Sequence, residues 1–495
     1  MIRNPVLPGH HPDPSFLRVG DDYYIATSTC EWTPGVRLHH SRDLETWRSL
    51  GGALLDLDLT GYPDSGGVWA PSLSYADGEF HLLYSMVSSY AGGFTDSPNY
   101  VVTAPTIEGP WSAPVLVHAR GFDASLFHDG DDSWVINLEH DWRPGHGGSA
   151  GLEATRYDRF TRQPFGEPVR LRLPPRAGWI EGPNLYRRGD WYYLLTADGG
   201  TSWEHRVTVL RARSLAGPYE RDPNGPLVTA RHDPDLPLQK AGHGSLVQTP
   251  DGRWLLAYLV ARPHGRHGPC VLGRETALAE VRWTADGWPV VPGGVPTTSG
   301  FPDQDIPGPQ WQTLRRPATD GWIDIGDTIT IRGGRSPQSL IEPSLLARRL
   351  TAPRCSFEAT VDFKPTGFQH LAGITVYYNT RNWHFLYLTG GGELRLATRD
   401  HGELTIHDHT IKTDATVRLG ADLDGPSLTF RHLTGDGWQR FGPVLDATVV
   451  SDEHAREGDT MGFTGAFAGL WVWDLTGAGH SAEFSDVAYR IGPSD

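Results

Sequence analysis

Three carboxylates stand at the starts of short hydrophobic segments that resemble one another. Asp13 lies in the sequence PDPSF, Asp123 in FDASL and Glu181 in EGPNL. Hydrolysis of an acetal between two sugars needs two acidic groups in one pocket. One is a carboxylic acid that protonates the leaving oxygen, and the other is a carboxylate that activates water or attacks carbon. If the fold brings these three residues together, the chain has the groups for that reaction.

The neighbours of each carboxylate indicate a separate role for it. Glu181 is preceded by Trp-Ile and followed by Gly-Pro, an apolar setting that raises its pKa, as a general acid requires. Asp13 lies between two prolines, which hold the backbone stiffly, so we expect a fixed general base there. The charge of Asp123 would raise the pKa of Glu181 further, or Asp123 would hold the sugar or orient Glu181.

Each of these residues also has a simpler explanation. Asp beside Pro or Ser forms turns, and only the expected register of all three carboxylates across the repeat favours a shared site. His243 stands in another copy of the segment, GHGSL, where it could donate to a substrate, bind an ion or only cap the axis. Trp69 starts the copy WAPSL, where it is either a wall for a sugar ring or an ordinary packing residue.

The element that must position these residues is a long repeat. A Ser or Asn recurs in the five copies at positions 15, 72, 125, 184 and 245, at intervals of 57, 53, 59 and 61 residues. After each copy a turn that contains Asp leads into a second, aromatic strand. This spacing is longer than that of a WD40 repeat and fits blades of about four strands. The sequence therefore predicts an all-β, five-bladed β-propeller whose innermost strands begin at one mouth of the central channel.

A second domain is expected because 495 residues exceed the size at which one hydrophobic core stops growing. We place the propeller at residues 1–300, a linker at 301–318 and a β-sandwich at 319–495. The linker region is dense in Gly, Pro and Thr, and beyond it alternating strands resume without the repeat. Residues 340–350 are the best candidate for a short helix.

Charge and composition limit the partners. The formal net charge is −16, which argues against nucleic acid and anionic membranes, because both require basic patches. A small neutral oligosaccharide fits this charge, and homo-oligomer formation stays open. No apolar stretch resembling a signal peptide precedes the first repeat, so we expect a cytoplasmic protein. Three distant cysteines are expected to be buried and unpaired.

Several motifs together resemble glycoside hydrolase family 43, and within it the two-domain β-xylosidases. They are NPVLPG with PDPS, WAP, GFDASLF, EGP and LGRET, and in the second domain YYNT and GAF. The resemblance runs over nearly the whole chain. It implies a five-bladed propeller followed by a concanavalin-like jelly-roll sandwich, and hydrolysis with inversion. It also implies Asp13 as base, Asp123 as pKa modulator and Glu181 as acid.

The resemblance implies further site residues. Arg274 is expected to bind sugar hydroxyls, while Trp32 and Trp69 line the subsite for the non-reducing end. His243 is expected at the axis, beside the substrate and near Ca²⁺ or another cation in the channel. The chemistry itself requires no cofactor and no metal. Phe467 is expected to close the pocket from an aromatic loop of the sandwich.

Two segments depart from those xylosidases on the side where the leaving group would lie. They read EHDWR at 139–143 and FTD at 94–96, where an aromatic platform and a Lys are expected to be missing. A closed pocket favours removal of one terminal sugar. We therefore predict an inverting exo-β-xylosidase that releases xylose from β-1,4-xylo-oligosaccharides, with side activity on α-L-arabinofuranosides. The alternatives are an α-L-arabinofuranosidase proper and a non-catalytic carbohydrate-binding propeller, which would not need three carboxylates.

Overall fold

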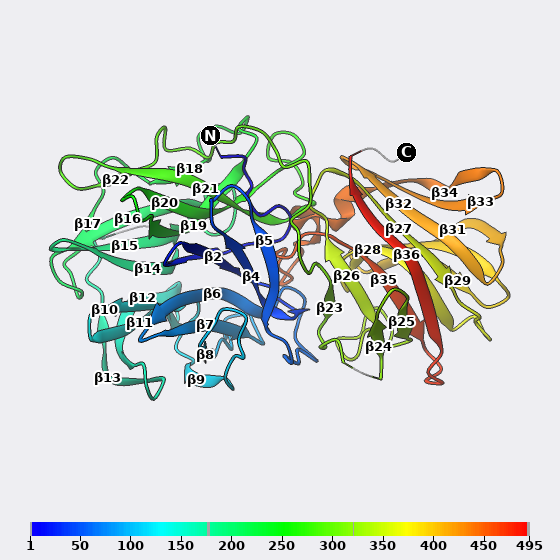
Figure 1. Cartoon of the computed structure of the whole chain (residues 1–495), viewed down its shortest axis with the longest axis horizontal. Coiled ribbons are helices and arrows are strands. Elements are labelled where there is room, and N and C mark those ends of the chain that lie inside the picture. Colours follow the sequence, from blue (N-terminus) through cyan, green and yellow to red (C-terminus); the bar gives the residue numbers. More distant parts are fainter. Residues whose placement is uncertain (1, 176–178, 320, 493–495) are drawn as a thin grey trace.

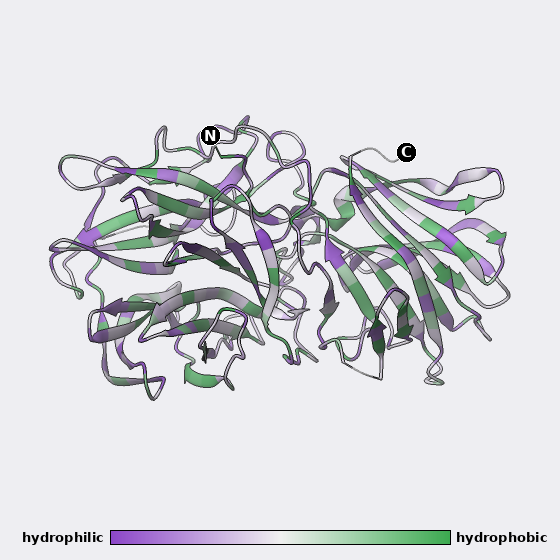
Figure 2. Ribbon diagram, in the orientation of Figure 1, coloured by the Kyte–Doolittle hydropathy of each residue, from purple (hydrophilic) through white to green (hydrophobic). Residues whose placement is uncertain are grey.

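The computed structural model describes residues 2–175, 179–319 and 321–492, and it shows two β-domains side by side (Figure 1). Hydrophobic and hydrophilic residues alternate along many strands, as strands with one buried face require (Figure 2). The described helices are short: η1 (Ala447–Val450) and α1 (Asp452–Ala455). Within the same residues, no helix has the length and apolarity of a membrane span. The prediction of a five-bladed propeller followed by a β-sandwich is confirmed.

Each blade is an antiparallel sheet whose strands follow one another outward from the channel. The first blade contains β1 (Ser15–Val19), β2 (Asp22–Thr27), β4 (Gly35–Ser41) and β5 (Arg48–Leu54). The second contains β6 (Gly67–Ala76), β7 (Glu79–Val87), β8 (Asn99–Ala104) and β9 (Val115–His118). The third contains β10 (Ser125–Asp129), β11 (Asp132–Asp141), β12 (Gly148–Asp158) and β13 (Gln163–Arg170).

The last two blades complete the ring. The fourth contains β14 (Ile180–Arg188), β15 (Trp191–Asp198), β16 (Arg206–Ala212), β17 (Glu220–Arg221) and β18 (Val228–Thr229). The fifth contains β19 (Gln239–Gln248), β20 (Trp254–Ala261), β21 (Arg274–Trp283) and β22 (Pro289–Val290). The amino-terminal segment joins this blade, because Leu7 pairs with Thr276 and the N–H of His11 donates to the carbonyl of Arg274 at 2.8 Å.

The second domain stacks two sheets. The eight-stranded sheet has the order β3 (Trp32–Thr33), β23 (Gln312–Leu314), β26 (Leu345–Arg349), β35 (Phe467–Asp474), β28 (His370–Asn379), β29 (Asn382–Thr389), β30 (Glu393–Asp400) and β31 (Glu403–Lys412). The seven-stranded sheet has the order β24 (Ile323–Ile325), β25 (Ile329–Arg332), β36 (Ser481–Ile491), β27 (Arg354–Asp362), β32 (Thr416–Asp424), β33 (Ser427–Thr434) and β34 (Gly437–Asp446).

The eight-stranded sheet is buried on both faces at its centre. Every residue of β28, β29 and β35 is buried. One face packs aliphatic residues such as Ile374 against the other sheet, and the opposite face forms an aromatic cluster that includes Trp471 and reaches Trp32 of the propeller. Because a propeller residue belongs to this cluster, the two domains share one packed interface.

Two expectations for the region between the domains need correction. The predicted linker, 301–318, contains β23, which pairs with β3 of the first propeller repeat on one side and with β26 on the other. The short helix predicted at 340–350 is wrong, because this region contains the strand β26. Pairing with β23 and β35 and burial of Leu345 and Leu346 outweigh the local helix propensity of a Leu- and Arg-rich segment.

Candidate active site

The same backbone irregularity interrupts the start of every innermost strand. Two residues before the recurring Ser or Asn, the backbone has a positive φ between 31° and 56° in all five blades: Asp13, Ala70, Asp123, Gly182 and His243. In three blades the pairing register shifts across this residue, as in a β-bulge. Bulges turn side chains out of the sheet, and non-glycine residues in this region of φ concentrate at functional sites. The repeat thus places the equivalent residues of five chain segments at one mouth of the channel.

The carboxylates occupy two adjacent positions of this repeat, which corrects the expectation of a single register. Asp13 and Asp123 are the positive-φ residues themselves. Glu181 comes one residue earlier, at the position that Trp69 and Phe122 occupy in their blades, and Gly182 takes the positive φ. A Cβ at Gly182 would lie 3.0 Å from the ring of His243, so glycine allows that imidazole to pack against the backbone.

These positions line a cavity of about 560 Å³ at the channel mouth. Six of the eight predicted site residues contribute to its wall: Asp13, Trp69, Asp123, Glu181, His243 and Arg274. The volume lies in the range typical of small-molecule pockets. Three carboxyl groups therefore meet in a space that holds a small ligand.

Asp13 lies among positive and hydrogen-bonding groups. Its Oδ2 accepts a hydrogen bond from the Ser28 hydroxyl at 2.7 Å, and Nη1 of Arg274 lies 3.4 Å from its Oδ1. The His243 Nδ1 lies 3.6 Å from the same oxygen. Burial alone would raise the pKa of Asp13, but Arg274, His243 and Ser28 together outweigh burial and hold it below its usual value. The group is therefore a carboxylate at neutral pH.

Glu181 lies in an apolar setting. Burial raises its pKa to about 7, and the charge of Asp13 acts in the same direction. The indole N–H of Trp179 donates to Oε2 at 2.5 Å and opposes this rise, as does Arg274. The Trp179 ring stacks on Phe122 with centroids 6.3 Å apart. Glu181 can therefore hold a proton near neutral pH, as a general acid must.

Asp123 has a pKa well above its usual value, because of burial first and then the charges of Glu181 and Asp13. A hydrogen bond from the Gly182 backbone N–H acts in the opposite direction. The repulsion between the carboxylates of Asp123 and Glu181 is mutual, so it opposes the loss of both protons from the pair.

A loop of the sandwich domain, residues 456–466, supplies one wall of the pocket through Phe463. The Arg274 guanidinium lies 4.7 Å from the centroid of this ring and donates to the Phe463 carbonyl at 3.2 Å. Trp69 meets the ring edge-on at 5.6 Å. The loop approaches the propeller closely, since a Cβ at Gly273 would lie 2.7 Å from the Cα of Gly465.

Two predicted site residues lie outside this cavity. Trp32 and Phe467 have no exposed surface and stack on each other with centroids 3.9 Å apart, in the aromatic cluster between the domains. The expectation that they line the pocket is wrong. Phe467 begins β35, in which every residue is buried, whereas Phe463 lies in the preceding loop. The alternation that starts at Phe467 could have indicated a strand, and the Gly residues before it a loop.

Another part of the cavity wall carries exposed aromatic surface. Thr95, His140 and Trp142 line the cavity there. Phe94, which is 74% exposed, packs against Trp142, which is 41% exposed, and His140 stacks on the same indole at 5.0 Å. The segments that depart from the family pattern therefore still present an aromatic platform at the rim.

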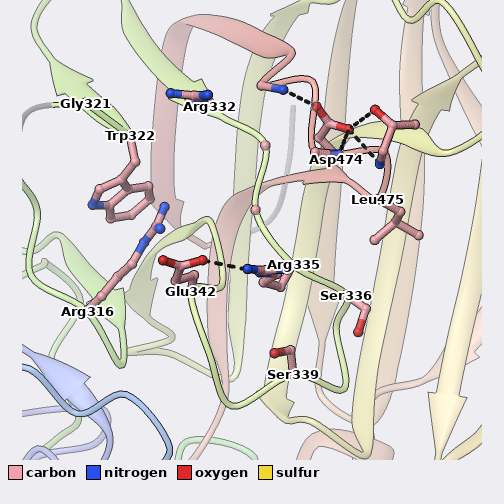
Figure 3. Close-up of a pocket in the computed structure, with 15 residues that line it drawn as sticks. Arg316, Gly321, Trp322, Arg332, Arg335, Ser336, Ser339, Glu342, Asp474 and Leu475 are labelled. Atoms are coloured by element: carbon pink, nitrogen blue, oxygen red, sulfur yellow. Dashed lines mark hydrogen bonds and ion pairs between the residues drawn. The ribbon is translucent and has the colours of Figure 1, made fainter.

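A larger cavity, of about 680 Å³, lies on the sandwich domain (Figure 3). Its carboxylates are Glu342, which pairs with Arg335 at 3.2 Å, and Asp474. Asp474 accepts hydrogen bonds from four backbone N–H groups and one hydroxyl of the segment that follows it. Since both carboxylates are engaged, the propeller pocket is the candidate active site.

The groups that could hold a metal lie elsewhere. Within the described ranges, the two sets of three His, Cys, Asp or Glu residues close enough to share an ion are both in the sandwich domain. The cation expected near His243 stays a prediction.

Comparisons with known proteins agree with this architecture. Residues 2–289 match the family model of Glycosyl hydrolases family 43, and residues 301–490 match that of the Beta xylosidase C-terminal Concanavalin A-like domain. Xylosidase/arabinosidase 43B of Humicola insolens is 40% identical over 530 residues, covering 99% of this chain and 97% of that protein. The beta-xylosidase of Bacillus subtilis is 37% identical, with 99% of each chain covered. The crystal structure of xylan beta-1,4-xylosidase from Bacillus halodurans matches with a TM-score of 0.94 at 40% identity, over 99% of this chain and 100% of that one.

Proposed function

This chain belongs to glycosyl hydrolase family 43, and on that basis we propose that it is an inverting exo-β-xylosidase. It releases single xylose units from the non-reducing ends of β-1,4-xylo-oligosaccharides and has side activity on α-L-arabinofuranosides. The observation that carries the proposal is the pair of carboxyl groups in one pocket with opposite pKa shifts: Asp13 is held ionised, and the pKa of Glu181 is raised to about 7.

The two groups divide the reaction between them. Asp13 takes a proton from a water molecule while the oxygen of that water forms a bond to the anomeric carbon. Glu181 gives its proton to the glycosidic oxygen as the bond between this oxygen and the anomeric carbon breaks. Inversion requires room for this water, so we expect the two carboxyl groups about 6.5–9.5 Å apart. Asp123 modulates the pKa of Glu181, and it holds the sugar or positions the acid.

Exo action is supported by the aromatic walls of the pocket. Trp69 and Phe463 meet edge-on in one wall, and Trp142, which packs against Phe94, lines another part of the cavity. Aromatic faces bind sugar rings by stacking. We expect one xylose residue to bind beside Trp69 and the rest of the oligosaccharide to extend toward Trp142.

The second candidate function is that of an α-L-arabinofuranosidase proper. It is favoured by the name of one relative, Xylosidase/arabinosidase 43B, which joins both activities in one protein. A non-catalytic sugar-binding propeller is disfavoured, because binding alone does not require a carboxyl group with a pKa of about 7 beside an ionised one.

Hydrolysis of a 4-nitrophenyl β-D-xyloside and of the matching α-L-arabinofuranoside tests the proposal. We expect the larger kcat/KM on the xyloside and a measurable value on the arabinofuranoside, with both lost in Asp13→Asn. A much larger kcat/KM on the arabinofuranoside would favour the second candidate. Absence of turnover on both substrates, together with binding of xylobiose, would indicate a binding protein.

A further inference from the structure

A group of nitrogen and oxygen donors lies at the base of the loop that carries Phe463. Asp400 ends β30, His401 occupies the turn to β31, and His454 lies on α1. The Nε2 of His454 is 2.6 Å from Oδ1 of Asp400, and the Nε2 of His401 is 3.8 Å from the same oxygen. One ligand atom from each of the three residues lies within 4.8 Å of the others.

The backbone holds His401 in place. Its φ is 47° and that of Gly402 is 87°, which is the two-residue hairpin turn that normally favours Asn-Gly. Positive φ is uncommon outside Gly, and Asn, Asp and His are the residues that adopt it most readily. The Arg381 guanidinium donates to the His401 carbonyl at 2.6 Å and so fixes the turn from outside.

The two nitrogens of His401 have different surroundings. Nε2 is buried and has no hydrogen-bond partner among the described residues, and it faces Asp400. Nδ1 lies 3.3 Å from Oε2 of Glu457, which Arg381 also contacts at 2.8 Å. In metal sites, a His that binds the ion with one nitrogen usually donates the other N–H to a carboxylate. Glu457 is placed to be that carboxylate.

A second cluster of the same residue types has no carboxylate oxygen free to bind an ion. His370, Asp474 and His480 also lie close together, but Asp474 accepts five hydrogen bonds from the segment that follows it. Both oxygens are engaged. Among the described residues, the Asp400 carboxylate accepts a side-chain hydrogen bond only from His454. The Asp400 cluster therefore keeps lone pairs for an ion, and the Asp474 cluster does not.

We propose that Asp400, His401 and His454 form a binding site for a divalent transition-metal cation, with Zn²⁺ as the fitting example. Two imidazoles and one carboxylate are ligands that suit Zn²⁺, with water in the remaining position. The ion replaces the proton between His454 and Asp400. The three side chains are between 31% and 45% exposed, so solvent can deliver the ion.

The site would stabilise the loop that forms one wall of the pocket. The helix α1 is already held on its propeller side, where Glu453 pairs with Lys240 and accepts the Cys270 N–H at 2.6 Å. An ion on His454 would hold the opposite side. The chain then runs through Arg456 and Phe463, which line the pocket, without another helix or sandwich strand between them.

Calorimetric titration of the chelator-treated full-length protein with ZnCl₂ tests the proposal. We expect one ion per chain, a higher Tm with Zn²⁺, and slower amide exchange in residues 456–466. Glu457→Gln should weaken binding about tenfold, as loss of an orienting carboxylate does, and His454→Gln should weaken it more. The matched control is His480→Gln in the saturated cluster, which should leave the affinity unchanged.

A second variant guards against misfolding. His401→Asn removes the ligand but places the preferred residue in the turn, so it should fold at least as well as the parent and still lose the ion. The proposal is overturned if Zn²⁺ does not bind, or if it binds His401→Asn as tightly as the parent. Binding that survives both ligand variants but is lost in His243→Asn would place the ion in the propeller channel, and this too would overturn it.

Discussion

The pKa of a buried carboxyl group is shifted in opposite directions on the Asp13 side and on the Glu181 side of the pocket. Burial raises the pKa of both groups. On the Asp13 side, the Arg274 guanidinium and two further partners outweigh burial and leave the pKa below its usual value. On the Glu181 side, the opposing interactions are weaker than burial, and the pKa is about 7. The partners of each group, more than its depth, decide its protonation.

This difference defines the pH range of activity. The reaction needs Asp13 ionised and Glu181 protonated at the same time. Asp13 is ionised above its lowered pKa, and Glu181 keeps its proton up to about pH 7. We expect kcat/KM to be highest in mildly acidic solution and to fall as the pH rises through about 7.

Replacing Asp13 or Glu181 should have the largest effect on kcat. The two replacements should differ in how the loss depends on the leaving group. Asp13→Asn should lower kcat about 10²- to 10⁴-fold on every substrate, because every substrate needs an activated water. Glu181→Gln should cause a similar loss on xylobiose but a much smaller one on an aryl xyloside, whose leaving group needs no proton. Steady-state kinetics on both substrates measure this.

The parent enzyme assayed on the same two substrates is the control. An equal loss for Glu181→Gln on both substrates would mean that Glu181 is not the acid. A leaving-group dependence in Asp13→Asn instead would mean that the two roles are exchanged.

Removing the cation beside Asp13 should move the acidic limb of the pH profile. Arg274→Met should raise the pKa of Asp13, because the guanidinium beside this carboxylate favours its charged form. Because the base must be ionised, activity would then be lost at a higher pH on the acidic side. Because Arg274 also lowers the pKa of Glu181, the basic limb should move to higher pH as well. Arg266→Met, at an exposed arginine that pairs with Asp235, is the control. An unmoved acidic limb would show that Arg274 does not set the ionisation of Asp13.

The smallest change in the pH profile is expected for the Asp123 variant. Because a charged Asp123 would oppose the ionisation of Glu181, Asp123→Asn should lower kcat through lost positioning and move the basic limb of the pH profile to lower pH. The pH dependence of kcat/KM for this variant is the measurement. An unmoved basic limb would mean that Asp123 acts by positioning alone and does not change the pKa of Glu181.

The repeat made the fold and the carboxylates predictable. Five copies of one segment must pack as equivalent strands, so residues at equivalent places meet at one channel mouth. The equivalence of the copies therefore predicts that Asp13, Asp123 and Glu181 lie close together. The Asp-containing turns after each inner strand were predictable for the same reason, and the structure has two-residue loops there in four blades.

Details that depend on backbone conformation or distant contacts were not predictable. Glu181 and Asp123 occupy different positions of the repeat because the residue after Glu181 has a positive φ. Both Ala70 and Gly182 adopt this conformation at the equivalent position, so the residue type does not predict it. Trp32 is buried because its two-residue strand pairs with β23, almost 300 residues later in the chain. Phe463 and Phe467 differ in role because β35 begins between them.

The first-formed product tests the central claim most directly. In ¹H NMR of a β-xyloside digest, followed before mutarotation, an inverting reaction driven by Asp13 and Glu181 gives α-xylose first, and β-xylose grows in later. If β-xylose forms first, the reaction proceeds with retention, and a water activated by Asp13 is not the nucleophile.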